Sequence, residues 1–244
     1  MLDGIAMVYV GTSGWNYPHW KGAFYPEGLP QAKWLKHYVE FFNCVELNVT
    51  FYRLVKKKTF QNWRQNTPDN FSFVTKGSRF ITHIKKLKYV SQPLDLFINH
   101  ARGLKDKLAL VLWQLPPSYK KDIKRLVYFL KLLKKTNLRH SFEFRNESWF
   151  NKEVYQILKE YNICLCIANS PRFPCERVIT ADFLYLRFHG RDLLYASDYS
   201  DRELKEWGKF ARGFKKHKDI FAFFNNDARG FAVKNALRFR ELLG

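Results

Sequence analysis

The sequence predicts an α/β protein, a single (β/α)8 TIM-like barrel over residues 1–244, with parallel strands surrounded by outer helices. Three observations predict this fold. Short apolar segments typical of strands alternate with helical patterns along the whole chain, and such alternation produces a parallel sheet. The length of 244 residues is near the roughly 250 residues of one barrel, and no linker divides the chain. No Gly-x-Gly-x-x-Gly follows the first strand, which disfavours the alternative, an open dinucleotide-binding sheet.

The expected strands are short runs rich in β-branched and aromatic residues, bounded by turn residues. In chain order they are Met7–Thr12, Asn43–Asn48, Phe71–Lys76, Leu108–Leu115, Ser141–Arg145, Ile163–Ala168, Phe183–His189 and Ile220–Asn225. The expected helices have apolar residues spaced three and four positions apart. They are Gln31–Phe42, Lys56–Asn66, Asp95–Lys105, Lys120–Lys135, Asn151–Tyr161, Asp201–Lys215 and Phe231–Leu243.

The chain is strongly basic, with 42 Lys and Arg against 22 Asp and Glu and a net charge of +20. This balance suits a polyanionic partner such as nucleic acid, and lysine-rich, solvated helix surfaces would also produce it. Cys44, Cys164 and Cys166 fall in expected strands, where a free thiol acts as a small apolar group, and their spacing is not typical of zinc. We expect reduced thiols and a cytoplasmic protein. No apolar run approaches the roughly 20 residues of a membrane span, so no membrane partner is expected.

Residues 141–145, Ser-Phe-Glu-Phe-Arg, show how polar residues are arranged in the expected strands. Successive strand residues point to opposite faces, so Glu143 and Arg145 share one face and the two phenylalanines share the other. In a barrel, Phe142 and Phe144 would pack under outer helices, while Glu143 and Arg145 would point into an enclosed site. A strand at the molecular surface would instead expose its polar face to water.

The same alternation places polar residues on one face near the C-terminal ends of six expected strands. They are Glu46 with Asn48, Lys76, Gln114, Glu143 with Arg145, Arg187 with His189, and Asn225 with Asp227. Active sites of (β/α)8 barrels lie at this end of the strands, so the set predicts a site at the barrel mouth. The alternative is a buried ion-pair network that only fills the barrel, since the acids and bases of the set nearly balance.

The loops on the same rim add further candidates. His189-Gly190-Arg191 and Asn225–Gly230 follow the last two strands, where barrels often hold a phosphate at a helix N-terminus. Asn226 or Asp227 could instead cap the last helix. Four aromatic residues could stack on a base or a sugar, or could form a hydrophobic lid. They are Trp15, Tyr17, Trp20 and Trp149.

Motifs along nearly the whole chain resemble those of one known family. They are Gly11–Pro26, Glu46–Arg53, Lys76–His83, Gln114–Pro117, Phe142–Phe150, Arg187–Arg191 and Phe224–Ala236. Together they resemble the YecE-like family, also called domain of unknown function 72. The resemblance implies a TIM-like barrel and no established activity. The chain departs from the family pattern at Asn169-Ser170, where we would expect an Asp-Ser pair.

We expect an enzyme, a hydrolase or lyase, that acts on a phosphate-containing substrate, nucleic acid included. Endonuclease IV and sugar isomerases are analogues by fold alone. Glu46 or Glu143 would be the general base and His189 the acid, with Asp227 as a further catalytic candidate. The candidate substrate-binding residues are Trp15, Tyr17, Trp20, Asn48, Tyr52, Lys76, Arg79, Gln114, Arg145, Trp149, Arg187, Arg191, Asn225 and Asn226.

Two alternative functions remain open. A glycosidase would use Glu46 and Glu143 as its carboxylate pair, roughly 5–5.5 Å or roughly 6.5–9.5 Å apart. A non-catalytic nucleic-acid binder would use the basic loop 83–88 and the lysines at positions 120, 121 and 124. The acidic residues and His189 offer enough ligands for one divalent cation and too few for a multi-zinc site.

Overall fold

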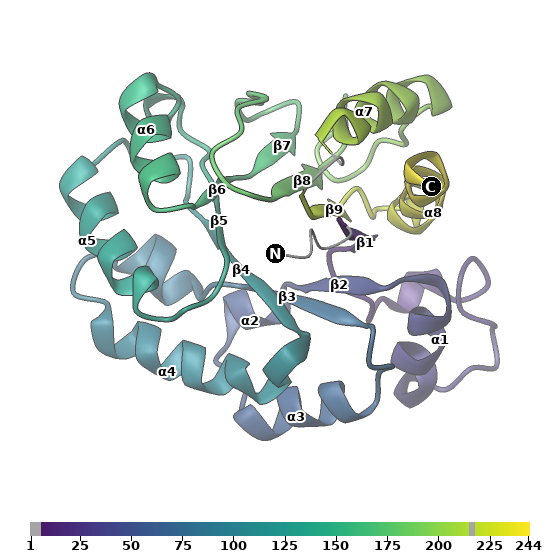
Figure 1. Ribbon diagram of the computed structural model, residues 1–244. Coiled ribbons are helices and arrows are strands. Elements are labelled where there is room, and N and C mark those ends of the chain that lie inside the picture. The colour runs from purple at the N-terminus through teal and green to yellow at the C-terminus, as the bar shows by residue number, and fades with distance from the viewer. Residues whose placement is uncertain (1–5, 215–217) are drawn as a thin grey trace.

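The structure, a computed structural model, describes residues 6–214 and 218–244. It is an α/β fold in which every strand pair is parallel. In Figure 1 the strands surround a common centre and the helices lie outside them. The strands are β1 Val8–Thr12, β2 Cys44–Leu47, β3 Ser72–Lys76, β4 Leu108–Gln114, β5 His140–Glu143, β6 Cys164–Leu165, β7 Ile167–Asn169, β8 Leu184–Phe188 and β9 Ile220–Phe224.

The prediction of one closed sheet of eight strands is wrong. The strands form two parallel sheets, one of four strands in the order β1-β9-β8-β7 and one of five in the order β2-β3-β4-β5-β6. The break falls inside the expected strand Ile163–Ala168. Its first part pairs with β5 and its second part with β8. Between them, the backbone N–H of Cys166 donates to the Phe142 carbonyl over 2.8 Å, so the chain changes partner at this residue.

A second break separates β1 from β2, and side chains bridge it. The Asn43 amide accepts a hydrogen bond from Val10 N over 3.3 Å and donates one to the Val8 carbonyl over 2.7 Å. The Tyr38 hydroxyl accepts from Thr12 N and donates to the Cys44 carbonyl. These bonds satisfy backbone groups that a strand ladder would otherwise pair.

The helices lie where the apolar spacing predicts them, with short additions. The major ones are α1 Trp34–Phe41, α3 Lys57–Gln65, α4 Ser91–Ala101, α5 Ile123–Lys134, α6 Lys152–Glu160, α7 Asp201–Phe214 and α8 Phe231–Leu243. Two short helical elements were not predicted, the single turn α2 Val49–Tyr52 and the π-helical turn Phe80–Ile84. Asp122 and Asn151 cap α5 and α6 by accepting from backbone N–H groups. The predicted end of the sixth expected helix, Lys215, lies outside the described residues.

The apolar core has an inner and an outer part. Val74, Leu110, Leu112, Tyr185 and Phe223 belong to the inner cluster, between the sheets. Phe142 and Phe144 belong to an outer cluster with the helices, and this confirms that residues 141–145 turn their phenylalanines toward the helices. Cys44, Cys164 and Cys166 are buried free thiols. None of the helices in the described residues is long and apolar enough to cross a membrane.

Candidate functional site

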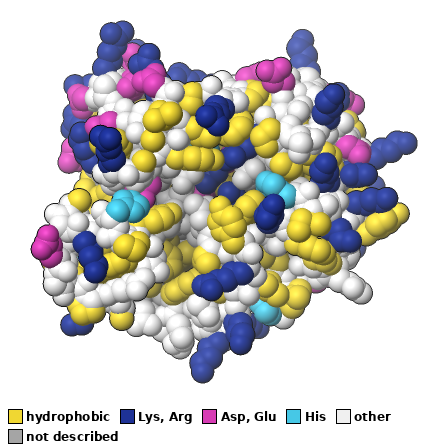
Figure 2. Space-filling model, turned by 180° about the vertical axis from the view of Figure 1, so that it is seen from behind, with side chains coloured by type: hydrophobic (Ala, Val, Ile, Leu, Met, Phe, Trp, Pro, Cys, Tyr) yellow, Lys and Arg dark blue, Asp and Glu magenta, His cyan; other side chains and the backbone are white. Residues whose placement is uncertain are grey.

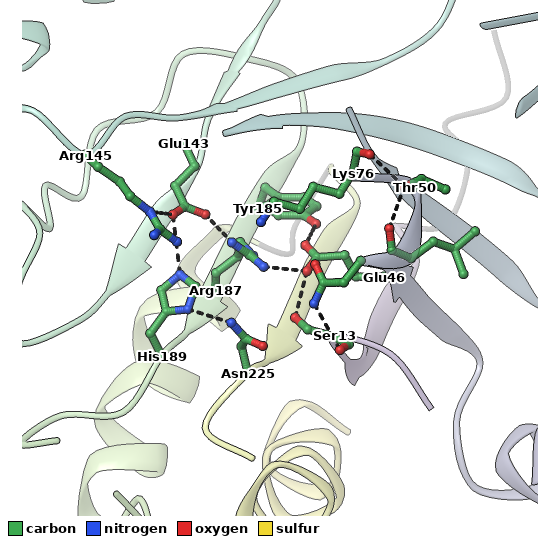
Figure 3. A network of polar contacts seen from close by, with 12 residues as sticks. Ser13, Glu46, Thr50, Lys76, Glu143, Arg145, Tyr185, Arg187, His189 and Asn225 are labelled. Carbon is green, nitrogen blue, oxygen red and sulfur yellow. Dashed lines mark hydrogen bonds and ion pairs between the residues drawn. The ribbon is translucent and has the colours of Figure 1, made fainter. Parts of the chain in front are cut away.

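The Arg187 side chain is the centre of a buried polar network above the inner core (Figure 3). It comes from β8 in the four-stranded sheet and has no exposed surface. One terminal nitrogen donates to Glu143 of β5, and the other donates to Glu46 of β2 over 2.6 Å. Its Nε has no acceptor among the described residues. Both carboxylates belong to the five-stranded sheet, so the guanidinium links the two sheets.

Glu46 is held as a carboxylate by three donors. Besides Arg187, the Tyr185 hydroxyl donates to its Oε2 over 2.5 Å and the Ser13 hydroxyl to its Oε1 over 2.7 Å. Burial alone would raise the pKa of Glu46, but Arg187 and the hydroxyl of Tyr185 outweigh that effect and lower it. Glu46 and Arg187 lie on the inward faces that the residue alternation predicts.

Glu143 is also ionised and buried. Arg145, two residues after it, donates from Nε to Glu143 Oε1 over 2.6 Å. Burial would raise the pKa of Glu143, but Arg145 and Arg187 hold it well below its usual value. The other face of the Arg145 guanidinium lies over Phe173, 4.3 Å from the ring centroid.

His189 completes this side of the network. Asn225 Nδ2 lies 3.1 Å from its Nδ1, and because that amide nitrogen can only donate, Nδ1 is the acceptor and the ring proton sits on Nε2. Nε2 faces Glu143 Oε1 at 3.6 Å, which is too long for a good hydrogen bond. Burial lowers the pKa of His189 to about 4, so the ring is neutral at pH 7.

Lys76 lies at the end of β3, and its amine has no hydrogen-bonding partner among the described residues. The only dashed line at this residue in Figure 3 joins its backbone carbonyl to the Thr50 hydroxyl, over 2.6 Å. Its Nζ lies 4.2 Å from the centroid of the Phe51 ring. Burial lowers the pKa of Lys76 to about 7, and the charges of Arg187 and Arg145 add to that effect.

A cavity of about 680 Å³ opens above the network. It is lined by residues that follow the C-terminal ends of the strands, as the sequence predicts for the mouth. The lining residues are Tyr17, Asn48, Phe51, Tyr52, Lys76, Arg79, His83, Gln114, Pro116, Pro117, Arg145, Tyr195, Asn225, Asp227 and Ala228. Glu46, Glu143, Arg187 and His189 are fully buried beneath it.

The structure brings only some of the predicted aromatic residues to this cavity. Tyr17 and Tyr52 line it. Trp149 is fully buried on the opposite face of β5, stacked 4.7 Å from Phe144. Trp20 is fully buried as well, and Trp15 lines a separate cavity between α1 and α3. Of the four rings predicted on the rim, Trp20 and Trp149 are therefore buried, Trp15 lies at another cavity, and only Tyr17 lines this one.

The predicted phosphate loops after the last two strands have other roles. Arg191 is exposed and pairs with Glu203 at 3.0 Å, away from the cavity. Asn226 is buried and donates to Ser197 and Asn235. Asp227 does line the cavity, where it accepts from Trp20 and contacts His19. Neither Asn226 nor Asp227 caps α8, which starts after Gly230 without a side-chain cap.

Six residues that line the cavity were not predicted as site residues: Phe51, His83, Pro116, Pro117, Tyr195 and Ala228. Phe51 and His83 lie within the motifs shared with the family, which is the signal that could have found them. Tyr195 lies in an irregular loop, in a left-handed conformation with φ of 65°, and no sequence pattern indicates its position. Burial lowers the pKa of His83 to about 4, and the charges of Lys76, Arg145 and Arg79 act in the same direction.

The ligands for a divalent cation do not assemble. Within residues 6–214 and 218–244, no group of three or more His, Cys, Asp or Glu side chains could hold a metal ion. Both buried glutamates direct their oxygens at guanidinium groups, and Asp227 is bonded to Trp20. The donor set of this site therefore does not fit the single cation considered from the sequence.

Comparisons with known proteins give a consistent result. A family model described as "Protein of unknown function DUF72" matches residues 9–244. UPF0759 protein YunF of Bacillus subtilis (strain 168) is 28% identical over 272 residues, which covers 97% of this chain and 95% of YunF. UPF0759 protein YecE of Escherichia coli (strain K12) is 29% identical over 147 residues, which covers 60% of this chain and 51% of YecE.

Solved structures share the fold. A DUF72 family protein from Thermotoga maritima MSB8 superimposes with a TM-score of 0.87 at 33% identity, covering 97% of this chain and 99% of that one. D-psicose 3-epimerase from Clostridium cellulolyticum H10, solved with D-tagatose, gives a TM-score of 0.57 at 10% identity, covering 96% and 98%. The epimerase likeness shows a common TIM-barrel-like fold and nothing about chemistry.

Proposed function

The chain belongs to the DUF72 family of proteins of unknown function, and from its site we propose that it is an enzyme, a hydrolase or lyase, that binds a phosphate-containing substrate at the mouth of the strands. One observation carries this proposal: four basic side chains line one cavity. They are Lys76, Arg79, His83 and Arg145. The acidic residue in the lining, Asp227, is already bonded to Trp20 and His19.

Two arginines are suited to hold the anion. Arg79 is exposed and forms no ion pair with a described residue. Arg145 uses only Nε for Glu143, so its terminal nitrogens remain available within the described structure. Guanidinium groups bind phosphate oxygens in pairs. The combined effect of Lys76, Arg79 and Arg145 on the pKa of His83 supports their convergence on one region.

The carboxylates and His189 receive a supporting role in this proposal. As base and acid they would have to reach the substrate, yet Glu46, Glu143 and His189 have no exposed surface. Their carboxylates neutralise Arg145 and Arg187 and fix the direction of Arg145. The glycosidase alternative finds no support here, because Glu46 and Glu143 bind the same guanidinium from below the cavity floor.

Calorimetric titration with pyrophosphate tests the proposal. We expect wild-type protein to bind it, and Arg79→Gln to weaken binding about tenfold or more, because a charged hydrogen bond contributes roughly 1.5–3 kcal/mol. Arg202→Gln, at an exposed arginine on α7 (side chain 89% exposed), is the matched control and should bind like wild type. No binding by wild type, or equal binding by both variants, would sink the proposal.

Nucleic acid is a second candidate partner, favoured by the surface next to the cavity. Tyr52, Phe80, Ile84 and Tyr89 are exposed, Tyr89 to 79%, beside Lys85 and Lys88 that lie over two of these rings. Figure 2 shows basic side chains spread over one face with hydrophobic ones between them. Bases stack on such rings while lysines contact phosphates.

Fluorescence anisotropy with a labelled single-stranded oligonucleotide measures the affinity of the protein for nucleic acid. Tyr89→Ala should weaken binding several-fold, since stacking contributes roughly 1–3 kcal/mol per base. Tyr128→Ala on α5 is the control. Affinity should also fall as salt rises. Salt-independent binding, or an equal loss in both variants, would exclude stacking on this surface.

A further inference from the structure

We propose that the Lys76 amine is a nucleophile that forms a Schiff base with a phosphorylated aldehyde or ketone bound in the cavity. The proposal deepens the function proposed above, because it takes the phosphate site from that function and adds the carbonyl group.

The position of the amine carries the inference. Lys76 is 7% exposed and is one of the residues that line the cavity, so a ligand bound there can contact the amine. Its backbone is fixed on both sides, by the Thr50 hydroxyl on its carbonyl and by Gly77 N donating to Leu112. The Phe51 ring flanks Nζ. Within residues 6–214 and 218–244, no acceptor ties up the amine, so its lone pair can reach a ligand.

Burial is the main cause that favours the neutral amine, and Arg187 and Arg145 act in the same direction while Glu143 and Glu46 oppose it. Glu46 and Glu143 face Lys76, but both already bond to Arg187 or Arg145. A protonated Lys76 would therefore be a third buried cation beside two guanidiniums, with no carboxylate left for it. A desolvated lysine beside other cations is the usual way in which proteins activate an amine nucleophile. The lowered pKa of Lys76, about 7, agrees with this arrangement.

Lys107 shows the contrast within the same chain. It is also buried, but its Nζ donates to the carbonyls of Arg64 and Thr67 over 2.9 and 2.7 Å. Burial lowers the pKa of Lys107 as well, but these acceptors bind the protons of its amine, so the amine is held in place and is not directed at a ligand. Because hydrogen-bond acceptors surround its amine, Lys107 has a structural role. The amine of Lys76 has no such acceptors among the described residues.

The step balances without an oxidant or reductant. The Nζ lone pair forms a bond to the carbonyl carbon, the C=O π pair moves to oxygen, and that oxygen gains a proton while nitrogen loses one. The resulting carbinolamine expels water and leaves a C=N bond. Arg79 and Arg145 would hold the phosphate, which places the carbonyl over the floor.

Reductive trapping tests the inference. Wild-type protein is incubated with pyridoxal 5′-phosphate and cyanoborohydride, which reduces the imine, and adducts are mapped by peptide mass spectrometry. We expect Lys76 to be the main adduct at pH 7, with a labelling rate that levels off above pH 7, whereas ordinary exposed lysines with a pKa near 10.4 keep gaining rate to higher pH. Lys76→Arg and Lys76→Met should remove that adduct, and Lys58→Arg, on the exposed face of α3, should keep it.

The remaining outcomes distinguish a failure of the Lys76 nucleophile from a failure of the phosphate site. If pyrophosphate binds but Lys76 acquires no adduct while wild type is folded by circular dichroism, the nucleophile proposal is overturned and the anion site stands. If pyridoxal without phosphate labels Lys76 as fast as its phosphate ester, and pyrophosphate does not bind, the phosphate site is overturned and the amine stands. An oligonucleotide with one abasic aldehyde, trapped at Lys76 faster than pyridoxal 5′-phosphate, would support the inference with nucleic acid as the source of the carbonyl; slower trapping would support a small molecule.

Discussion

Lys76 and Lys107 are both buried, and the number of acceptors around each decides what its burial costs. Lys107 has two backbone carbonyls and a hydroxyl for its three protons. Lys76 has the face of a phenyl ring. A buried cation without hydrogen-bond acceptors is costly, so Lys76 reduces the stability of the folded state. Residues kept at such a cost are typical of functional sites.

Replacing Lys76 should therefore stabilise the protein in a pH-dependent way. An unfolded lysine has a pKa of about 10.4, and that of folded Lys76 is about 7. The penalty is complete below pH 7 and is relieved as pH rises toward 10, by up to about 1.4 kcal/mol per pH unit. Lys76→Met should gain most over wild type near pH 7 and lose this gain toward pH 10, as measured by urea unfolding.

Lys107→Met is the matched comparison. It leaves the carbonyls of Arg64 and Thr67 without donors and should destabilise the protein by roughly 1–3 kcal/mol. If both variants lost stability by similar amounts at every pH, the difference between the two lysines would be refuted.

At the scale of elements, the two sheets are joined by side chains where backbone pairing stops. Asn43 and Tyr38 bridge β1 and β2 at the edge. In the interior, Arg187 of β8 reaches both β2 and β5. The polar network thus holds the fold together as well as forming the floor of the cavity.

Removing the central guanidinium should be strongly destabilising. Arg187→Met leaves Glu46 and Glu143 buried with fewer cations, and the loss of one partner from such a pair costs about 3–5 kcal/mol. Chemical unfolding of Arg187→Met measures this loss. Adding Glu46→Gln should restore part of it, because the uncompensated charge is then removed. Arg202→Met on α7 should change the free energy of unfolding by less than about 0.5 kcal/mol, and a comparable loss there would contradict the linking role of Arg187.

Gly77 sets the direction of the chain just after Lys76. A Cβ at this position would lie 2.2 Å from the Trp113 ring, which is fully buried. Gly77→Ala should cost roughly 1–3 kcal/mol through overpacking and should also reduce trapping at Lys76. Gly213→Ala on α7, where nothing lies within 4 Å, is the control and should be neutral or stabilising by up to about 1 kcal/mol. Unfolding curves that reversed this order would contradict the packing argument.

For the whole molecule, two buried histidines and the half-buried His83 contribute to the way in which stability responds to acid. The pKa of His140 is lowered to about 3 by burial, and those of His83 and His189 to about 4. Unfolded histidines have a pKa near 6.5, so the unfolded chain binds protons first as the pH falls from 6.5 to 4. Stability should fall over this range by up to about 1.4 kcal/mol per pH unit for each fully buried histidine.

Thermal unfolding from pH 7 to pH 4 measures that loss. His140→Gln should make the decline shallower, even if the variant is less stable at pH 7. A melting temperature that stays constant down to pH 4.5 would show that these rings bind protons equally well in the folded state.

The alternation of side chains along the strands predicted the orientation of site residues better than the loop sequences did. It placed Glu46, Glu143, Arg187 and His189 on inward faces, because a strand reverses its side chain at each residue. It could not say how deep each one lies. Glu46 and Arg187 form an ion pair and are fully buried beneath the cavity. Lys76 has no unpaired carboxylate beside it and lines the cavity.

Residues beyond the strand ends were harder to place. Trp20 and Trp149 lie in loops, where no period indicates which side is buried, and both packed into apolar clusters rather than onto the rim. The strand pattern also could not show that Ile163–Ala168 changes partner at Cys166. That change depends on the paths of β5 and β8, which are set by tertiary packing.

The two-sheet arrangement has a consequence for the order in which the chain folds. The five-stranded sheet uses strands in sequence order, each joined to the next by one helical crossover, and contacts of lower sequence separation form faster than contacts between the two ends of a chain. The other sheet pairs β1 with β9, Val8 with Ile220, so it cannot be completed until nearly all of the polypeptide has left the ribosome. We expect residues 44–165 to gain structure first during synthesis, with the Arg187 link closing last.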